Sequence, residues 1–311
     1  MNMAMRCLFI YKNHQKWIIG AIFNEIEKSS GIPIVRNYLP ETFRQTFKFC
    51  NIRGRFFPKI GEINVYATHK LLFKFGKAIS SPKKRVLITQ IIDESDFELK
   101  KNLEILQSCE RFVVQNRFVR DFLLGCGISS EKIHVFPGAI DRQTFYPGTV
   151  FNESILMSGD FKVRKNPEAV AQLVRNNPDL EFIIHGKNLK ILLDKGLGEA
   201  LNVELIEWNF SKQPQLIREA SVFVSLSKLE GGPFSILEAL ASGTPVVATD
   251  VGIAREYLNG ENGFVIPVDF NPEDLRNRIL ESQQLKKKTA GMDLLEGKFS
   301  WADYGNVIFG D

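Results

Sequence analysis

Two carboxylates lie eight positions apart on either side of a glycine-proline loop. Glu230 precedes the loop and Glu238 follows it, within a segment that begins at Ser227 and reads Ser-Lys-Leu-Glu-Gly-Gly-Pro-Phe-Ser-Ile-Leu-Glu. The pattern predicts a tight turn, a short helix and then a buried strand, so that both carboxylates and the first N–H groups of the helix converge. Helix-start N–H groups attract anions, and carboxylates accept hydrogen bonds from sugar hydroxyls. The segment therefore indicates a site for a ligand that carries both phosphates and hydroxyls.

A second segment concentrates cations before a predicted helix. Lys162, Arg164 and Lys165 precede Asn166 and Pro167, which are favourable residues for the N-cap and the first helical position. The cations would then gather at the positive end of a helix, where anions collect. The alternative interpretation is that they decorate an exposed loop.

These segments, with two others, resemble the C-terminal half of retaining glycosyltransferases of family 4, which have the GT-B fold and carry a Glu-x7-Glu motif. The resemblance covers roughly residues 132–264, whereas the first 130 residues match only loosely. It implies an α/β protein with two Rossmann-like domains, a crevice between them and a C-terminal helix that crosses back. The matching stretches are Val-Phe-Pro-Gly-Ala-Ile-Asp at 135–141, Met-Ser-Gly-Asp at 157–160, Arg-Lys-Asn-Pro at 164–167, and 230–250.

The resemblance also implies roles for individual residues. Glu230 would contact the donor sugar near its reacting face, Glu238 would hold the ribose hydroxyls, and Lys165 would help to neutralise the donor diphosphate. Glu238 has an alternative role, because Ser235 and Glu238 also match a capping box that closes the start of a helix. Trp208 lies where the base would be recognised, although it could equally be a packed aromatic residue. The other donor-binding candidates on this side are Gly159, Gly232, Phe234 and Ser235.

One position departs from the family pattern and bears on the mechanism. Asp160 stands where the family has an arginine, so Lys162 or Arg164 takes that role, or phosphate binding is weaker than usual. The implied reaction moves a sugar from a nucleotide-diphosphate donor to an acceptor with retention at the anomeric carbon. Cations and a helix end can stabilise the leaving diphosphate without a metal, so we expect no cofactor beyond a nucleotide sugar of UDP or GDP type. Glu230 and Lys165 are the residues assigned to catalysis.

The first domain departs from the family at two loops. Many relatives have a Gly-Gly loop after the first strand, whereas this chain has Lys12 and His14, which could supply charge in place of close backbone approach. On the acceptor side the family often has a His-Asp pair, whereas this chain has Gln90 and Asp93 and lacks the histidine. These four residues are the acceptor-side candidates, and the expected acceptor is a glycan, a lipid-linked glycan or a protein.

Positive charge is concentrated in the first half of the chain. Residues 1–140 contain 22 Lys and Arg against 12 Asp and Glu, while residues 141–311 contain 18 against 24. Within residues 44–85 Glu62 is the one acidic residue among many lysines and arginines, and phenylalanines alternate with these cations along the sequence. Such a surface could rest on anionic lipid headgroups or hold an acidic acceptor, and nucleic acid is the less favoured partner. The plain alternative is that the phenylalanines are core and the cations form a solvated face.

Length and composition indicate a cytoplasmic enzyme, with peripheral contact to a membrane as an option. The 311 residues and 44% hydrophobic content suffice for two cores, and no run of residues is apolar enough to span a membrane. Four cysteines without metal-site spacing are expected to be reduced thiols. The predicted divisions are an acceptor-side domain (1–138), a donor domain (139–295) and a tail (296–311) that docks on the first domain.

Alternating strands and helices predict the doubly wound sheets that this organisation requires. Two rival functions stay open from the residues alone: a non-catalytic GT-B subunit that stabilises a partner glycosyltransferase, and a sugar-nucleotide epimerase or phosphorylase. The expected helices are 16–28, 97–107, 117–124, 167–176, 213–219, 235–241 and 272–288, and the expected strands are 6–11, 86–92, 111–115, 154–157, 180–185, 203–206, 222–226, 245–248 and 263–267.

Overall fold

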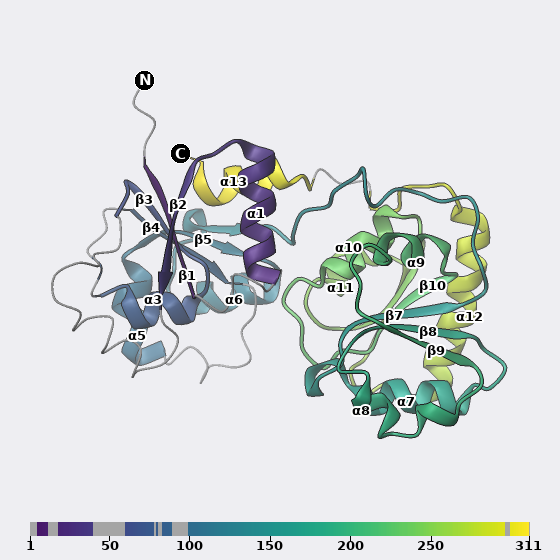
Figure 1. The fold of residues 1–311 in the computed structure, drawn as a ribbon. Coiled ribbons are helices and arrows are strands. Elements are labelled where there is room, and N and C mark those ends of the chain that lie inside the picture. Colours follow the sequence, from purple (N-terminus) through teal and green to yellow (C-terminus); the bar gives the residue numbers. More distant parts are fainter. Residues whose placement is uncertain are drawn as a thin grey trace. The chain divides into compact units, whose positions relative to one another are not determined.

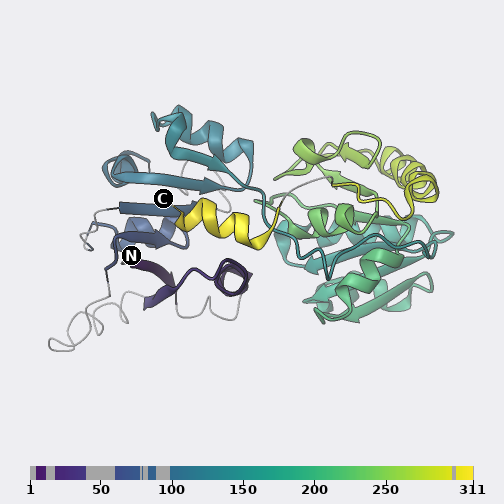
Figure 2. The same cartoon turned by 90° about the horizontal axis from the view of Figure 1, so that it is seen from above.

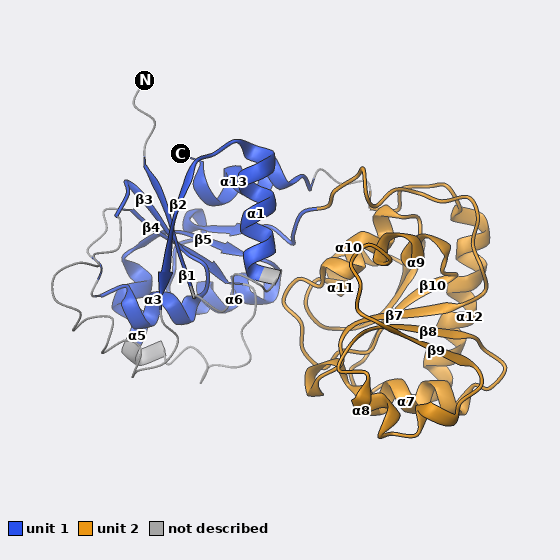
Figure 3. Ribbon diagram, in the orientation of Figure 1, with its two compact units in different colours: residues 1–139, 299–311 blue, residues 140–298 orange. Residues whose placement is uncertain are grey.

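The computed structural model describes residues 5–11, 18–39, 60–77, 79, 83–88, 99–295 and 299–310. The chain divides into two compact units, and the division places the last residues with the first unit (Figure 3). Unit 1 consists of Met1–Ala139 and Phe299–Asp311, and unit 2 consists of Ile140–Lys298.

Unit 1 is built on a parallel sheet of six strands in the order β2-β1-β3-β4-β5-β6. Its central strands are buried runs such as Ile63–Tyr66, as expected for a parallel sheet covered on both faces. Side chains of Thr68 and Asn116 cap the first turns of two helices, which satisfies backbone N–H groups at each helix start. The strands are β1 (Arg6–Tyr11), β2 (Ile34–Leu39), β3 (Ile63–Tyr66), β4 (Lys83–Ile88), β5 (Cys109–Val114) and β6 (Ile133–Val135), and the helices before unit 2 are α1 (Ile18–Ser30), α3 (His69–Phe75), α5 (Leu99–Gln107), α6 (Arg117–Gly125) and the 3-10 turn η2 (Ser130–Lys132).

Unit 2 is a second parallel sheet of six strands in the order β12-β11-β10-β7-β8-β9. The chain order reverses beside β7, and helices cover both faces, with α7 and α8 on one face and α9, α10 and α11 on the other (Figure 1). The strands are β7 (Ile155–Asp160), β8 (Phe182–Lys187), β9 (Val203–Glu207), β10 (Val222–Ser225), β11 (Val246–Thr249) and β12 (Gly263–Ile266); the helices are η3 (Val163–Lys165), α7 (Pro167–Asn176), α8 (Lys190–Leu193), η4 (Leu197–Glu199), α9 (Gln213–Glu219), α10 (Phe234–Ala241), α11 (Ala254–Tyr257) and α12 (Pro272–Thr289).

The C-terminal helix α13 (Trp301–Phe309) returns to unit 1 and lies beside α1 (Figure 2). It begins at a capping box between Ser300 and Asp303. Phe309 meets the edge of Phe23 on α1, with ring centroids 6.1 Å apart, and its side chain is fully buried. The predicted return of the C-terminal helix is therefore confirmed.

Three arginines from three strands of the unit 1 sheet cap the C-terminal end of α13. Arg6 on β1 donates to the Phe309 carbonyl (3.0 Å), and Arg111 on β5 donates to the Val307 carbonyl (3.0 Å). Arg85 on β4 donates to the carbonyls of Ile308 and Gly310. Guanidinium groups at this end favour the helix dipole and satisfy carbonyls that have no partner within the helix.

The predicted basic surface is revised at one of its cations. Arg85 is 2% exposed and pairs with Glu110 (2.5 Å), because it serves α13 rather than solvent. Lys83 pairs with Glu62 (3.8 Å), whereas Lys70 and Lys74 lie exposed on α3. Most of residues 40–59 and 78–82 fall outside the described residues, so the rest of that surface stays a prediction.

Asn166 and Pro167 occupy the predicted N-cap and first helical positions of α7, but the cap differs in detail. Asn166 adopts the left-handed conformation (φ 52°), and its side chain makes no capping hydrogen bond, because the preceding 3-10 turn ends on it. The alternative of a capping box between Ser235 and Glu238 does not hold, since α10 begins at Phe234 with Pro233 at the N-cap. No helix in the described part of the chain is long and apolar enough to cross a membrane.

Candidate functional site

The candidate site lies in unit 2 where β7 and β10 end. These two strands are neighbours in the sheet, and their carboxyl ends deliver Ser158 to Asp160 and Ser225 to Ser227 to the same edge. In open α/β sheets ligands bind at such carboxyl ends, beside the point where strand order reverses. The two motifs from the sequence converge here.

Glu230 and Lys165 form an ion pair that is nearly closed to solvent. The Lys165 Nζ lies 2.6 Å from Glu230 Oε1, and their side chains are 10% and 9% exposed. Arg164 donates to the same oxygen at 2.7 Å, and Ser227 Oγ donates to it at 2.9 Å. Two cations thus share one carboxylate, which leaves local positive charge suited to an anionic ligand.

Opposing effects act on the pKa of Glu230. Burial raises it, while the charges of Lys165 and Arg164 and the hydrogen bonds from Lys165 and Ser227 lower it. The net result is a pKa below the usual value of a glutamate, so Glu230 is ionised at neutral pH.

The loop that carries Glu230 is held at its start by two hydrogen bonds. The Lys228 N–H donates to the Arg164 carbonyl (2.8 Å), and the Thr249 hydroxyl donates to the Ser227 carbonyl (2.5 Å). Gly252, at φ +62°, lies beneath the loop, where an added Cβ would come within 2.7 Å of the Gly231 carbonyl. The position of Glu230 is therefore set by β11 and η3 together.

Gly159 permits the close approach of Lys165. Its φ is +149°, and a Cβ there would lie 3.0 Å from Lys165 Cε. Lys162 turns to a different partner, since its Nζ lies 2.9 Å from Asp160 Oδ2. Of the two cations that could take the role of the missing arginine, Arg164 is therefore the one that joins Lys165.

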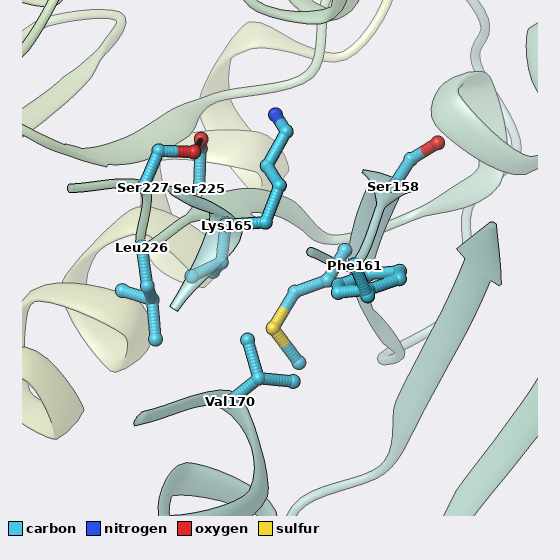
Figure 4. Close-up of a pocket in the computed structure, with 9 residues that line it drawn as sticks. Ser158, Phe161, Lys165, Val170, Ser225, Leu226 and Ser227 are labelled. Carbon is cyan, nitrogen blue, oxygen red and sulfur yellow. Dashed lines mark hydrogen bonds between the residues drawn. The ribbon is translucent and has the colours of Figure 1, made fainter. Parts of the chain in front are cut away.

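A small pocket opens beside this cluster (Figure 4). The Lys165 ammonium and the hydroxyls of Ser225 and Ser227 lie at one end of it, and Val170 and Leu226 line the other. The pocket is thus polar where the cations lie and apolar toward the core.

Glu238 belongs to a second polar cluster on the same edge of the sheet. Its Oε2 accepts from Gln213 Nε2 at 3.4 Å, and Gln213 is 1% exposed. Burial raises the pKa of Glu238 to about 7, against a smaller lowering by Gln213. Ser158 Oγ, which lines the pocket beside Lys165, donates to Gln213 Oε1 at 2.8 Å, so the two clusters are contiguous.

Trp208 stacks on His185, with ring centroids 4.9 Å apart and planes inclined by 19°. His185 is fully buried and shares Gln213 with Ser158. The Trp208 side chain remains partly exposed, so this aromatic residue lies at the border of the Glu238 cluster.

The structure brings most of the predicted residues together and leaves four untested. Lys165, Arg164 and Glu230 form one cluster. Phe234 and Ser235 begin α10, which carries Glu238, and Gly232 lies in the loop just before it; all three are half-buried. Gln213 was missed, because a glutamine outside any motif gives no signal in a single sequence. Ser158 and Ser227 lie within the quoted segments but were given no role there. The predicted residues outside the described part of the chain are Lys12, His14, Gln90 and Asp93.

The described part of the chain contains no cluster of side chains suited to bind a metal. Across the described ranges, no group of three or more His, Cys, Asp and Glu side chains could hold a metal ion. The chemistry available at the site consists of cations, hydroxyls, carboxylates and an aromatic face.

Comparisons with known proteins agree with this architecture. Residues 152–292 match the family model of glycosyl transferases group 1. An uncharacterized glycosyltransferase of Methanocaldococcus jannaschii is 34% identical over 208 residues, covering 62% of this chain and 56% of that protein. A UDP-Gal:alpha-D-GlcNAc-diphosphoundecaprenol alpha-1,3-galactosyltransferase of Escherichia coli is 28% identical over 163 residues, covering 44% and 42%. The chain thus spans about half the length of the curated relatives it matches.

Solved structures extend the likeness to both units. Anabaena HepE in complex with UDP and glucose superimposes with a TM-score of 0.73 at 15% identity, over 98% of this chain and 95% of that one. Sucrose-phosphate synthase from Thermosynechococcus elongatus gives a TM-score of 0.71 at 15% identity, over 96% of each chain. The chain therefore has the GT-B fold of these glycosyltransferases, and its second unit carries the match to glycosyl transferases group 1.

Proposed function

We propose that this protein is a retaining glycosyltransferase, related to family 4, that moves a sugar from a nucleotide-diphosphate donor to an acceptor hydroxyl. The observation that carries the proposal is the buried Glu230–Lys165 pair with Arg164 beside it. Cations so placed can neutralise a diphosphate, and Glu230 and Glu238 are the two carboxylates of the Glu-x7-Glu pattern. One relative is named for a UDP sugar, and several neighbours were solved with UDP, which supports a nucleotide-sugar donor of UDP or GDP type.

The proposed reaction depends on stabilising the negative charge that develops on the departing diphosphate. The bond between the anomeric carbon and the diphosphate oxygen breaks as a bond to the acceptor oxygen forms on the same face. The acceptor proton passes to the departing diphosphate, so no protein nucleophile is needed. Lys165 and Arg164 stabilise the negative charge that builds on the leaving group, which is the dominant electrostatic task. Since these residues are side-chain cations, the reaction we propose is independent of metal.

Binding and turnover together test this function. We would measure calorimetric binding of UDP, GDP, ADP and their sugars, then donor hydrolysis and the anomeric configuration of any product by NMR. Lys165→Ala is expected to lower turnover by about 100-fold or more, and Glu230→Ala should abolish it. Lys288→Ala, which removes an exposed lysine on α12, is the matched control and should behave as the wild type.

Other outcomes distinguish the rival functions. Absence of binding to every nucleotide would favour a non-catalytic subunit that stabilises a partner glycosyltransferase. An altered sugar nucleotide without a new glycoside would indicate an epimerase. An inverted product would reject retention while leaving glycosyl transfer in place.

We also propose a cytoplasmic enzyme that acts on a glycan or lipid-linked acceptor and contacts an anionic membrane surface through the cations of unit 1. Lys70 and Lys74 are exposed one helical turn apart on α3, and each lysine near an anionic membrane contributes about 1 kcal/mol. Lys70→Glu combined with Lys74→Glu should weaken sedimentation with phosphatidylserine vesicles roughly tenfold or more. The charge-matched control is Lys287→Glu with Lys288→Glu on α12, and equal loss in both variants would reject a specific surface on unit 1.

A further inference from the structure

A buried chain of hydrogen bonds runs from the turn after β9 to Glu238. The Asn209 N–H donates to His185 Nε2 (2.9 Å), and His185 Nδ1 lies 2.7 Å from Gln213 Oε1. Gln213 Nε2 then donates to Glu238 Oε2 (3.4 Å). His185 and Gln213 are 0% and 1% exposed, so their contact is closed to solvent, while the contacts to Asn209 and Glu238 are partly buried.

The groups at the two ends of this series of hydrogen bonds, a backbone N–H and a carboxylate, fix which partner donates in each bond. A backbone N–H can only donate, so His185 Nε2 must accept and the ring hydrogen must reside on Nδ1. That hydrogen requires an acceptor, which places the Gln213 carbonyl oxygen toward His185. The Gln213 NH₂ group therefore faces Glu238, which is the orientation that a carboxylate needs.

A third contact agrees with the same orientation. The Ser158 hydroxyl donates to Gln213 Oε1 at 2.8 Å, so the carbonyl oxygen accepts two hydrogen bonds. Flipping the Gln213 amide would place its NH₂ group against the His185 Nδ1–H, which can only donate here. His185 on β8 thus sets the orientation of the glutamine, and Ser158 on β7 adds a second hydrogen bond to the same oxygen.

We propose that Gln213 is a positioning residue that orients the Glu238 carboxylate for the hydroxyls of a nucleoside, and thereby sets the preference of the site for a ribonucleotide. This inference rests on the proposed function. With Oε2 held by Gln213, the other carboxylate oxygen is directed to the ligand. A carboxylate free to rotate would pair less well with two vicinal hydroxyls, because part of its orientational freedom would be lost on binding.

The measurement is the ratio of dissociation constants for a 2′,3′-dideoxynucleoside diphosphate and the matching ribonucleoside diphosphate. Gln213→Glu keeps an acceptor for Ser158 and His185 but replaces the NH₂ donor. Gln213→Met has a similar length and loses both functions. A site that hydrogen-bonds a hydroxyl discriminates strongly against the analogue that lacks it, so we expect both variants to lower the ratio at least fivefold.

Two controls separate positioning from general stability. Ser158→Ala removes one contact to Gln213 but keeps its donor to Glu238, so the ratio should change less than twofold. Adding Gln213→Glu to a Glu238→Gln variant should not lower the ratio further, because Gln213 acts through Glu238. A purely structural role would shift the unfolding temperature without moving the ratio. If Gln213→Met does not fold, Gln213→Glu decides.

The failure of this inference is distinguishable from failure of the proposed function. Wild-type protein that binds no nucleotide overturns the proposed function and this inference with it. Wild-type protein that binds nucleotides without preferring the ribose form overturns this inference alone. So does a preference that survives both Gln213 variants.

Discussion

At the scale of single residues, the two carboxylates of the motif have opposite electrostatic environments. Glu230 receives three hydrogen bonds from Lys165, Arg164 and Ser227 and has a lowered pKa, whereas Glu238 has one weak donor and a raised pKa. Two carboxyl groups whose environments shift their pKa values in opposite directions are suited to different tasks. Glu230 suits a fixed charge beside a diphosphate, and Glu238 suits a carboxylate that a ligand completes.

This difference predicts that donor affinity depends on pH through Glu238. The pKa of about 7 exceeds its usual value, so Glu238 is increasingly protonated below pH 7 and ionised above it. Sugar hydroxyls donate to the ionised form, so affinity for a nucleotide sugar should rise roughly tenfold between pH 6 and pH 8. Calorimetry with Glu238→Gln is the control, since that variant should bind with little pH dependence. A steep dependence that persists in the variant would assign the titration to another group.

The raised pKa of Glu238 also makes the folding stability of the protein depend on pH. Because the folded pKa of Glu238 is raised, the folded state binds more protons than the unfolded state between the unfolded value and about 7. The contribution of this group to stability is therefore greatest below that range and is lost as pH rises through about 7. The ionised form that the ligand needs is the form that destabilises the free protein.

At the scale of elements, α12 connects the helices that carry the site. Lys286 on α12 is fully buried, and its Nζ donates to the Arg218 carbonyl (3.2 Å), the Gly243 carbonyl (3.0 Å) and Thr244 Oγ1 (3.0 Å). These acceptors lie at or just beyond the C-terminal ends of α9 and α10. A single ammonium thus ties together the two helices that carry Gln213 and Glu238, and it favours both helix dipoles.

Removing this ammonium should destabilise unit 2. Lys286→Ala leaves three buried acceptors without a donor and a cavity in place of the side chain, with an expected cost of about 2–4 kcal/mol in the free energy of unfolding. Chemical denaturation measures the change. Lys287→Ala, at the exposed neighbouring position on the same helix, should change stability by less than about 0.5 kcal/mol. Equal effects from both variants would show that Lys286 does not tie the helices.

Local signals explain which elements the sequence predicts well. The helices Pro167–Asn176 and Gln213–Glu219 have the predicted bounds, because proline near a helix start and an apolar face are strong signals. β2, β3 and α3 were missed, since they lie in or beside the cation-rich part of the first half, where short buried strands lack alternation. The Glu230 cluster followed from motif spacing, whereas Gln213 depends on contacts between distant segments.

At the scale of the whole molecule, the chain closes unit 1 with its own last residues. Helix α13 buries Tyr304, Ile308 and Phe309, and Phe136 stacks on Tyr304 with ring centroids 4.7 Å apart. The arginines at its C-terminal end add donors from three strands. Unit 1 is therefore complete only after unit 2 has been synthesised, so the two ends of the chain share one core.

The docking of α13 should accordingly stabilise residues at the beginning of the chain. Phe309→Ala removes a fully buried ring that contacts Phe23, and a cavity of this kind costs about 3–5 kcal/mol. Hydrogen exchange should then accelerate in α1 and β1, whereas the amides of β7 and β8 in unit 2 should keep their protection. Asn306→Ala, at an exposed position of the same helix, is the control and should leave exchange unchanged. If exchange in α1 stays at the wild-type rate after Phe309→Ala, α13 does not stabilise the first unit.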